Sequence, residues 1–384
     1  MDLLLLKHPG KCQTSAKERV LARDAPWTRE QYETAQRIVQ LYEPNMRLLD
    51  EALAAPNSQM LTVQGKEDSV VYLRPVRRTA FLLSATAAVK VQQGDCAGGF
   101  EFLVKSARMG NLVCRGGVFT HHLVGRAAGS IATSAATALV FQHDIPVDVL
   151  RHSAQEFLAC ADDVEPFVEA LRAEAYMAIQ SVDLYYSKLP LGSSKRSKLP
   201  FDQQLTRYPL LLQLMISYPN ETRRNIRACY QHPVAAELSG SIAERTVHMT
   251  SLFGALFRTR SKAEILLLVR DPLGIAYANE ALAGLGQAKS NSRAQDAQLR
   301  GTALFLAVMA YTKEHGHPPN DLKTLVPGYL PHLPIDPFSC KPYLYLPSGV
   351  PGLPKGTWAV YSTPGTTSLR HTWERIRKAM QRPG

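Results

Sequence analysis

The stretch PVRRTAFLLSATAAVKVQQGDCAGGFEFLVKSA, residues 75–107, decides the fold class. Apolar residues recur at helical spacing between Phe81 and Val89, and again between Phe100 and Ala107. The pair Gly94-Asp95, which is typical of turns, separates the two patterns. The stretch therefore predicts a helical hairpin, in which two helices are joined by a tight turn.

Helical patterns continue on both sides of this hairpin. Upstream, Thr28 and Gln31 have the spacing of a capping box, and Pro44 predicts a kink or break in the helix that follows. Downstream, three further helices are predicted over residues 118–141, 147–161 and 164–186. The hairpin resembles one unit of a tetratricopeptide array, but the chain has no regular 34-residue period. We predict irregular stacked helical hairpins over residues 28–187.

A basic segment interrupts the helical pattern at residues 188–200, KLPLGSSKRSKLP. It has four basic residues, no acidic residue, two prolines and a Gly-Ser-Ser tract, which predicts a loop or an interdomain linker. Helical patterning resumes and continues over residues 201–290. At the end of that region, the stretch from Gly284 to Ser292 is rich in small and polar residues and predicts a spacer.

Composition excludes several protein classes. The chain has 384 residues, of which 45% are hydrophobic and 20% charged. These values exclude a disordered chain, a collagen-like chain and a small disulfide scaffold, and the length predicts two or three domains. The formal net charge is +11. Most of it comes from residues 188–200 and the tail, residues 366–384, so we expect these segments to be candidates for contact with an acidic partner or an acidic membrane surface. Nucleic acid is a less favoured partner.

Apolar runs bear on membrane association. The run Leu3 to Leu6 is shorter than the apolar region of a signal peptide. The longer run from Gly129 to Phe141 is still shorter than a membrane-spanning helix. We therefore expect neither an export signal nor a membrane anchor within this chain.

The composition changes in the last quarter of the chain. Eleven of the 25 prolines fall between Pro318 and Pro364. A helical pattern over residues 294–311 precedes them, and two short segments with strand composition follow, at residues 342–346 and 357–362. The sequence thus predicts a mainly α protein that ends in a small α+β module, residues 293–365.

One ordered pattern in this module carries a family resemblance. Residues 300–362 are RGTALFLAVMAYTKEHGHPPNDLKTLVPGYLPHLPIDPFSCKPYLYLPSGVPGLPKGTWAVYS. This stretch resembles the C-terminal globular region of the major pseudopilin of type II secretion systems. It resembles more closely the pseudopilin-like tail of a group of bacterial envelope proteins. The residues that carry the resemblance include Gly316, Pro319, Asp321, Leu325, Tyr329, Pro334, Asp336, Pro337, Phe338, Pro342, Tyr345 and Tyr361.

The resemblance implies a place in the cell envelope, on its periplasmic side, and a protein partner linked to secretion. The cytoplasm remains the alternative location. Pseudopilins carry an acidic calcium-binding loop near the C-terminus, whereas residues 363–368 of this chain contain no carboxylate. Because calcium prefers charged oxygen ligands, we expect no calcium site and no cofactor. Cys340 stands where glycine is common in the corresponding turn.

Physical roles can be assigned to the motif residues independently of the family. Gly316 can adopt the left-handed conformation that ends a helix. Asn320 is expected to cap a short helix over residues 321–326. The Asp336 carboxylate can accept hydrogen bonds from nearby backbone N–H groups. Aromatic side chains are expected to pack the strands against the long helix, namely Tyr343, Tyr345, Trp358 and Tyr361.

Candidate catalytic residues are few. His152 and Glu156 lie four residues apart and share a helix face, and Glu174 lies in an apolar helical stretch. An enzyme would need these side chains to converge. Asp162, Asp163, Glu165 and Glu169 form an acidic cluster between two predicted helices. Asp162 and Asp163 are expected to favour the start of the second of these helices.

The sequence contains no zincin motif, phosphate-binding loop or GxSxG elbow. We therefore expect a non-enzymatic cell-envelope scaffold or interaction protein. An enzyme with a site near His152, Glu156 and Glu174, and a basic protein that binds nucleic acid or acidic lipid, remain the alternatives.

Overall fold

The computed structural model describes residues 27–55, 66–187, 219–238, 285–347 and 358–362. Within these ranges the fold is mainly helical, as predicted. The elements are α2 (Arg29–Ala54), α3 (Lys66–Gln92), α4 (Cys96–Cys114), α5 (Phe119–Gln142), α6 (Val147–Asp162), α7 (Phe167–Ser187), α10 (Pro219–Leu238), α14 (Leu285–His315), the 3-10 helix η3 (Leu322–Leu325), β1 (Leu344–Leu346) and β2 (Ala359–Tyr361). The segment 188–200, the tail 366–384 and most of residues 201–290 lie outside the described residues.

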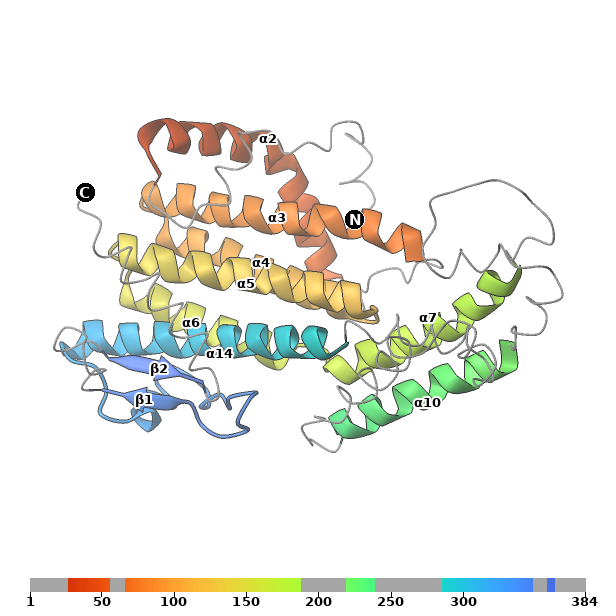
Figure 1. The fold of residues 1–384 in the computed structure, drawn as a ribbon. Coiled ribbons are helices and arrows are strands. Elements are labelled where there is room, and N and C mark those ends of the chain that lie inside the picture. The colour runs from red at the N-terminus through yellow and green to blue at the C-terminus, as the bar shows by residue number, and fades with distance from the viewer. Residues whose placement is uncertain (1–26, 56–65, 188–218, 239–284, 348–357, 363–384) are drawn as a thin grey trace.

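The helices stack in layers. In Figure 1, α2 lies above α3, the pair α4 and α5 follows, and α6 and α14 lie below that pair. The two strands lie beneath α14, and α7 and α10 form a separate pair to one side. The central helix is α5, which packs against α3, α4, α14 and α7.

The predicted hairpin is formed by α3 and α4. Gly94 in the turn has a φ of +89°, in the left-handed region that favours glycine. Asp95 then caps α4, because its carboxylate accepts a hydrogen bond of 2.9 Å from the Gly98 N–H. Lys90 at the end of α3 bonds to the same carboxylate at 2.7 Å. The hairpin prediction is confirmed.

Helices α2 and α3 each contain an internal proline. The capping box of Thr28 and Gln31 opens α2 as predicted, and the helix continues through Pro44, although Figure 1 shows that α2 changes direction along its length. In α3, Pro75 lies inside a helix that begins nine residues earlier. Leu73 and Val76, on either side of this proline, are buried in a cluster with Leu49 of α2. That burial offsets the hydrogen bond which proline cannot make.

The long helix α14 has 31 residues and begins at Leu285. The spacer predicted from Gly284 to Ser292 is therefore wrong, because all but its first residue lie in the helix. Ala288 is buried in a cluster with Leu171 of α7, and Ser292 contacts α5. Tertiary packing thus overrides the weak helical preference of these small polar residues.

Two hydrophobic cores meet along α14. Its C-terminal half packs with α3 to α6, so that Leu304 shares a cluster with Leu150 and Phe157 of α6. Its N-terminal half packs with α7 and α10. The first cluster also includes Leu325 and Tyr343 of the C-terminal module. Residues of the range 293–365 and of the range 28–187 therefore share one hydrophobic core.

The strands β1 and β2 pair antiparallel, with Leu344 opposite Tyr361. Tyr343 and Tyr345 face α14 and its following loop: their hydroxyls donate to Ala297 O at 3.0 Å and to Pro319 O at 2.8 Å. Trp358 lies against Phe305 of α14, with ring centroids 5.7 Å apart. The predicted packing of aromatic side chains on the long helix is confirmed for Tyr343 and Trp358, whereas the Tyr345 hydroxyl bonds to the loop that follows the helix.

Helix α5 corrects one expectation about membrane segments. The apolar run from Gly129 to Phe141 belongs to a 24-residue helix, which has the length and composition to cross a membrane. Half of its most apolar window is buried inside the protein, among α3, α4 and α14. The core helix of a protein shows the same composition.

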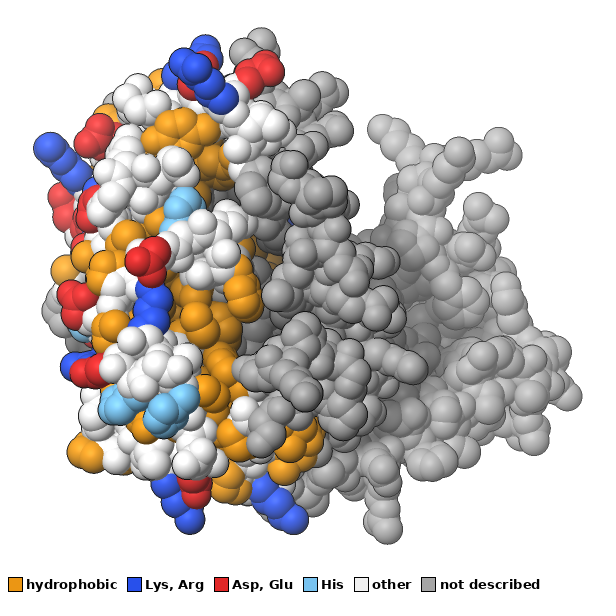
Figure 2. Space-filling model, turned by 90° about the vertical axis from the view of Figure 1, so that its left-hand side faces the viewer, with side chains coloured by type: hydrophobic (Ala, Val, Ile, Leu, Met, Phe, Trp, Pro, Cys, Tyr) orange, Lys and Arg blue, Asp and Glu red, His pale blue; other side chains and the backbone are white. Residues whose placement is uncertain are grey.

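The end of the molecule at the left of Figure 1 carries apolar side chains. Figure 2, which views the molecule from that side, shows them gathered in a band. Phe141, close to the end of α5, is 54% exposed, and its ring centroid lies 5.5 Å from that of Phe305. Because Phe305 also contacts Trp358, these rings connect α5, α14 and the residue directly before β2.

Candidate functional site: the groove between α4 and α6

Two adjoining hollows follow α4 and α6 and share Arg108; we refer to them together as the α4–α6 groove. The first hollow has a volume of about 270 Å³, and the second a volume of about 530 Å³. The first is lined by Ala52, Leu53, Ala55, Arg108, Leu112, Arg115, Ala159, Cys160 and Asp163. The second is lined by Ala97, Gly98, Glu101, Val104, Lys105, Arg108, Asp148, Val149, His152, Ser153 and Glu156.

Polar contacts hold the two helices beside each other. The buried amide of Asn111 in α4 donates to the carbonyl oxygen of Cys160 in α6 at 2.7 Å. Arg108 bonds to Glu156, and Arg115 bonds to Asp163 at 2.7 Å. The buried bond fixes the spacing of the helices, whereas the two ion pairs lie at the surface of the groove.

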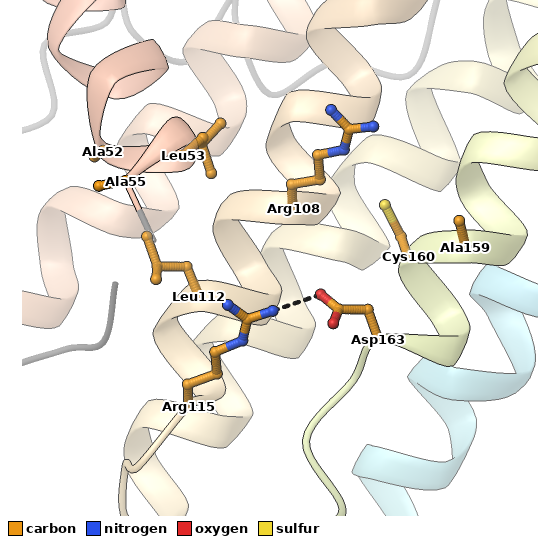
Figure 3. Close-up of a pocket in the computed structure, with 9 residues that line it drawn as sticks. All are labelled: Ala52, Leu53, Ala55, Arg108, Leu112, Arg115, Ala159, Cys160 and Asp163. Atoms are coloured by element: carbon orange, nitrogen blue, oxygen red, sulfur yellow. Dashed lines mark hydrogen bonds and ion pairs between the residues drawn. The ribbon is translucent and has the colours of Figure 1, made fainter. Parts of the chain in front are cut away.

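Figure 3 shows how the first hollow is built. Ala52, Leu53 and Ala55 come from the end of α2 on one side, and Ala159 and Cys160 come from α6 on the other. Between them, α4 supplies an apolar side chain, Leu112, and the two arginines flank it about one turn away on either side. The hollow thus combines a small apolar floor with two guanidinium groups.

Charge is distributed unevenly along the groove. The first hollow has two basic residues and one acidic residue, Asp163. The second hollow has two basic residues and three acidic ones, Glu101, Asp148 and Glu156. The groove is therefore more positive beside α2 and more negative at its other end.

The structure does not bring the three enzyme candidates together. His152 and Glu156 both line the second hollow, where His152 is exposed and the Glu156 carboxylate bonds to Arg108. Glu174 lies on α7 and accepts a hydrogen bond of 3.2 Å from the Phe119 N–H, at the start of α5. It is not among the residues that line either described hollow. Glu174 thus caps a helix.

The acidic cluster between α6 and α7 acts differently from the prediction. Asp162 pairs with Arg300 at 3.1 Å and with His332 at 2.8 Å, and Asp163 pairs with Arg115. The expectation that these two carboxylates favour the start of α7 is wrong. They lie at the C-terminal end of α6, where the helix dipole is negative, and the guanidinium groups of Arg300 and Arg115 offset that repulsion.

The two glutamates of the cluster have local partners. Glu165 accepts hydrogen bonds of 3.1 and 3.0 Å from the Gly116 N–H, which fixes the loop between α4 and α5. Burial raises the pKa of Glu165 above its ordinary value. Glu169, in the first turn of α7, pairs with Arg172. Each role is structural.

The motif residues that follow α14 shape a turn and a short helix. Gly316 has a φ of +78°, as expected for the residue that ends the long helix. Asp321, and not Asn320, caps the helix that follows, because its carboxylate accepts from the Lys323 N–H at 2.9 Å. The short helix begins one residue later than predicted, so the cap moves with it. Tyr329 donates from its hydroxyl to Glu314 at 2.5 Å, and burial raises its pKa to about 12.

Asp336 organises the turn before β1. Its side chain is completely buried, and it accepts hydrogen bonds from the Phe338 N–H at 3.1 Å and the Ser339 hydroxyl at 2.7 Å. These bonds confirm the predicted acceptor role. The Ser362 hydroxyl adds a bond of 2.6 Å that the sequence did not predict. The remaining motif residues lie around this turn: Leu325 and Pro334 are buried, Pro337 is half-buried, and Pro342 is exposed in a bridge with Ile335.

A polar seam that the sequence analysis missed joins α5 to α14. It consists of His122 and Arg126 on α5, and Ser292 and Asp296 on α14. Arg126 is 1% exposed and lies 3.1 Å from the Asp296 carboxylate, and His122 Nε2 lies 2.8 Å from Ser292 Oγ. Burial, and secondarily Arg126, lowers the pKa of His122 to about 4. One signal was available: Arg126 is the single Lys or Arg within the apolar α5.

The described residues contain no group of three or more His, Cys, Asp or Glu side chains arranged to hold a metal ion. Residues 363–368, where the sequence predicts that a calcium site is missing, lie outside the described ranges.

No family model, no curated protein and no solved structure matches this chain. The resemblance of residues 300–362 to pseudopilin-like modules stays a prediction.

Proposed function

We propose that this protein is a non-enzymatic scaffold of a bacterial cell envelope, which holds a protein partner in the α4–α6 groove. The observation that carries the proposal is the shared use of α6. One side of this helix lines the groove, through residues such as Ala159, and the other side packs on α14. The groove and the C-terminal module are thus parts of one packed body.

The chemistry of the groove favours a protein partner. Its floor is apolar and its rim carries the ion pairs of Arg108 with Glu156 and of Arg115 with Asp163. Surface ion pairs of this kind contribute roughly 0 to 1 kcal/mol each to stability. A partner can therefore exchange its own carboxylates for Glu156 or Asp163 at small cost while it covers apolar surface.

The envelope location rests on the resemblance of residues 300–362 to pseudopilin-like modules. The module keeps the buried Asp336 turn and the aromatic contacts of Tyr343 and Tyr345 with α14 and its loop. In a pseudopilin the module follows a single prepilin-type helix, whereas here it packs on a body of several helices. We infer that the module contacts a secretion apparatus while the helical body holds a partner. The proposed location is the periplasmic side of the envelope.

Photo-crosslinking in the native host tests the proposal. A photoreactive phenylalanine analogue replaces Ala159, an exposed residue of the groove wall, in one variant. In the control variant it replaces Leu41, which is 73% exposed on α2 and outside the groove. We expect an adduct with a distinct protein at position 159 only, recovered in the envelope fraction. Recovery of the native protein solely in the cytosol, without such an adduct, would overturn the proposal.

A further inference from the structure

We propose that the α4–α6 groove selects a partner segment whose charges are segregated, with acidic residues at one end and basic residues at the other. This inference rests on the proposed function and deepens it, because it specifies the chemistry of the partner. The occupant is an amphipathic helix that lies lengthwise in the groove, with its acidic end beside α2.

The positive end of the groove is formed by Arg108 and Arg115. They lie seven residues apart, Arg108 within α4 and Arg115 directly after its last residue, and both line the groove on the same side of the helix. Their side chains are 53% and 42% exposed, which leaves guanidinium donors open to solvent beside their own partners. Arginine has five N–H donors, so one carboxylate does not saturate it. This end fits the carboxylates of a partner.

The negative end is formed by Glu101, Asp148 and Glu156. Asp148 is exposed in the first turn of α6. The basic residue of this end, Lys105, is already bonded to Asp50 at 2.9 Å and to Glu101 at 3.2 Å, and its side chain is only 20% exposed. The charge of Lys105 is therefore offset within the protein by Asp50 and Glu101, and Glu156 is paired with Arg108. The exposed carboxylate of Asp148 is the group of this end that fits a lysine or arginine of a partner.

The floor and the length of the groove indicate a helix. Buried apolar side chains line each hollow: Leu112 lines the first, and Val104 and Val149 line the second. On α4, the lining extends from Ala97 to Arg115, which at 1.5 Å per residue is about 27 Å. An amphipathic helix of about five turns has this length, and the insertion of such a helix into an apolar groove is a common mode of recognition.

Binding of two synthetic helical peptides tests the inference. Both have about 18 residues, the same composition and the same apolar stripe. One has its glutamates in the first turns and its lysines in the last turns, and the other has the same charges interleaved. In fluorescence anisotropy at low salt, we expect the segregated peptide to bind the full-length protein at least about tenfold more tightly. This preference should decrease as salt screens the charges.

Charge-reversal variants locate the effect. The double variant R108E/R115E should lose the preference, whereas R224E/R227E, a matched reversal at exposed residues of α10, should keep it. Adding E101K and D148K to R108E/R115E exchanges the two ends, so the segregated peptide can bind in the opposite direction and the preference should return. A variant that regains the preference must be folded, so the rescue would show that R108E/R115E loses the preference through its changed charges and not through unfolding.

Each outcome decides the inference. Equal binding of the two peptides, or binding of neither, overturns it. The crosslink at position 159 does not depend on these peptides, so a partner captured there would leave the proposed function standing while the charge pattern fails. A preference that survives R108E/R115E would also overturn the inference, because binding would then take place elsewhere.

Discussion

Ser362 donates a hydrogen bond of 2.6 Å to the buried carboxylate of Asp336, 26 residues earlier in the chain. The same carboxylate accepts from Phe338 and Ser339 in its own turn. A single side chain thereby ties the turn before β1 to the residue that follows β2. The first prediction concerns this contact.

Asp336→Asn should destabilise the protein by about 2 kcal/mol, because hydrogen bonds to a charged acceptor contribute roughly 1.5 to 3 kcal/mol and an amide brings donors toward donors. Urea unfolding followed by circular dichroism measures the change. Asp321→Asn, at an exposed helix cap, is the control and should cost less, because asparagine also caps helices. Equal effects of the two substitutions would contradict the organising role of Asp336.

The second prediction concerns Cys340, which has a φ of +54° in an exposed turn. A residue with a Cβ destabilises the folded state by roughly 1 to 2 kcal/mol in this left-handed region. Glycine avoids that cost, but its greater conformational freedom stabilises the unfolded chain and cancels part of the gain. Cys340→Gly should therefore stabilise the protein by about 0.5 to 1 kcal/mol. Gly316→Ala is the opposite change at a φ of +78°, where a Cβ would meet no atom within 4 Å, and it should destabilise. A destabilised Cys340→Gly variant would contradict the prediction.

The third prediction concerns pH. Burial lowers the pKa of His122 to about 4, from an ordinary value of 6.5, so the folded protein holds this ring neutral. Below pH 6.5 the unfolded chain binds the proton first, and the free energy of unfolding should fall between pH 6.5 and pH 4 by up to about 3 kcal/mol. Above pH 6.5 the ring is neutral in both the folded and the unfolded chain, so burying it does not lower the free energy of unfolding.

Unfolding at pH 7.5, 5.5 and 4.5 measures this slope, and His122→Gln should reduce it. His121, whose pKa is also lowered by burial, accounts for part of the slope that remains. A His122→Gln variant with the slope of the original protein would show that this ring does not titrate with unfolding.

The fourth prediction concerns the ion pair of the polar seam. Asp296→Asn should cost about 3 kcal/mol, since removal of one partner leaves the buried guanidinium of Arg126 uncompensated. In R126M/D296N the charge is gone, and the double variant should be more stable than Asp296→Asn alone. A double-mutant cycle in urea gives the coupling energy. Additive effects would show that the two side chains do not interact.

The sequence predicted the parts of the fold that depend on neighbouring residues. The hairpin around Gly94 and Asp95, the capping box of Thr28 and the helix end at Gly316 are all local. The start of α14 was missed because Ala288 and Ser292 are held in the helix by contacts with α7 and α5. Those contacts are distant in sequence, so the local composition cannot predict them. The same reason explains the reversed role of Asp162, whose partner Arg300 is 138 residues away by number.

Less of the candidate site than of the fold could be predicted from the sequence. His152 and Glu156 were recognised as sharing a helix face, and both line the groove. The opposite wall consists of Ala52, Leu53 and Ala55, which are ordinary residues at the end of a helix. No spacing rule connects them to Arg108 and Arg115, because only the packing of α2 against α4 brings them together.

The position of α14 in both cores has a consequence for synthesis of the chain. The ribosome releases α5, α6 and α7 well before it makes residues 285–315, so Leu150 and Phe157 emerge without the leucines that later cover them. At about 5 to 20 residues per second, the delay is on the order of ten seconds. During that time the apolar faces of α5 and α6 are open to neighbouring chains. Until the last quarter of the protein has emerged, the folding chain therefore exposes more apolar surface than the finished molecule.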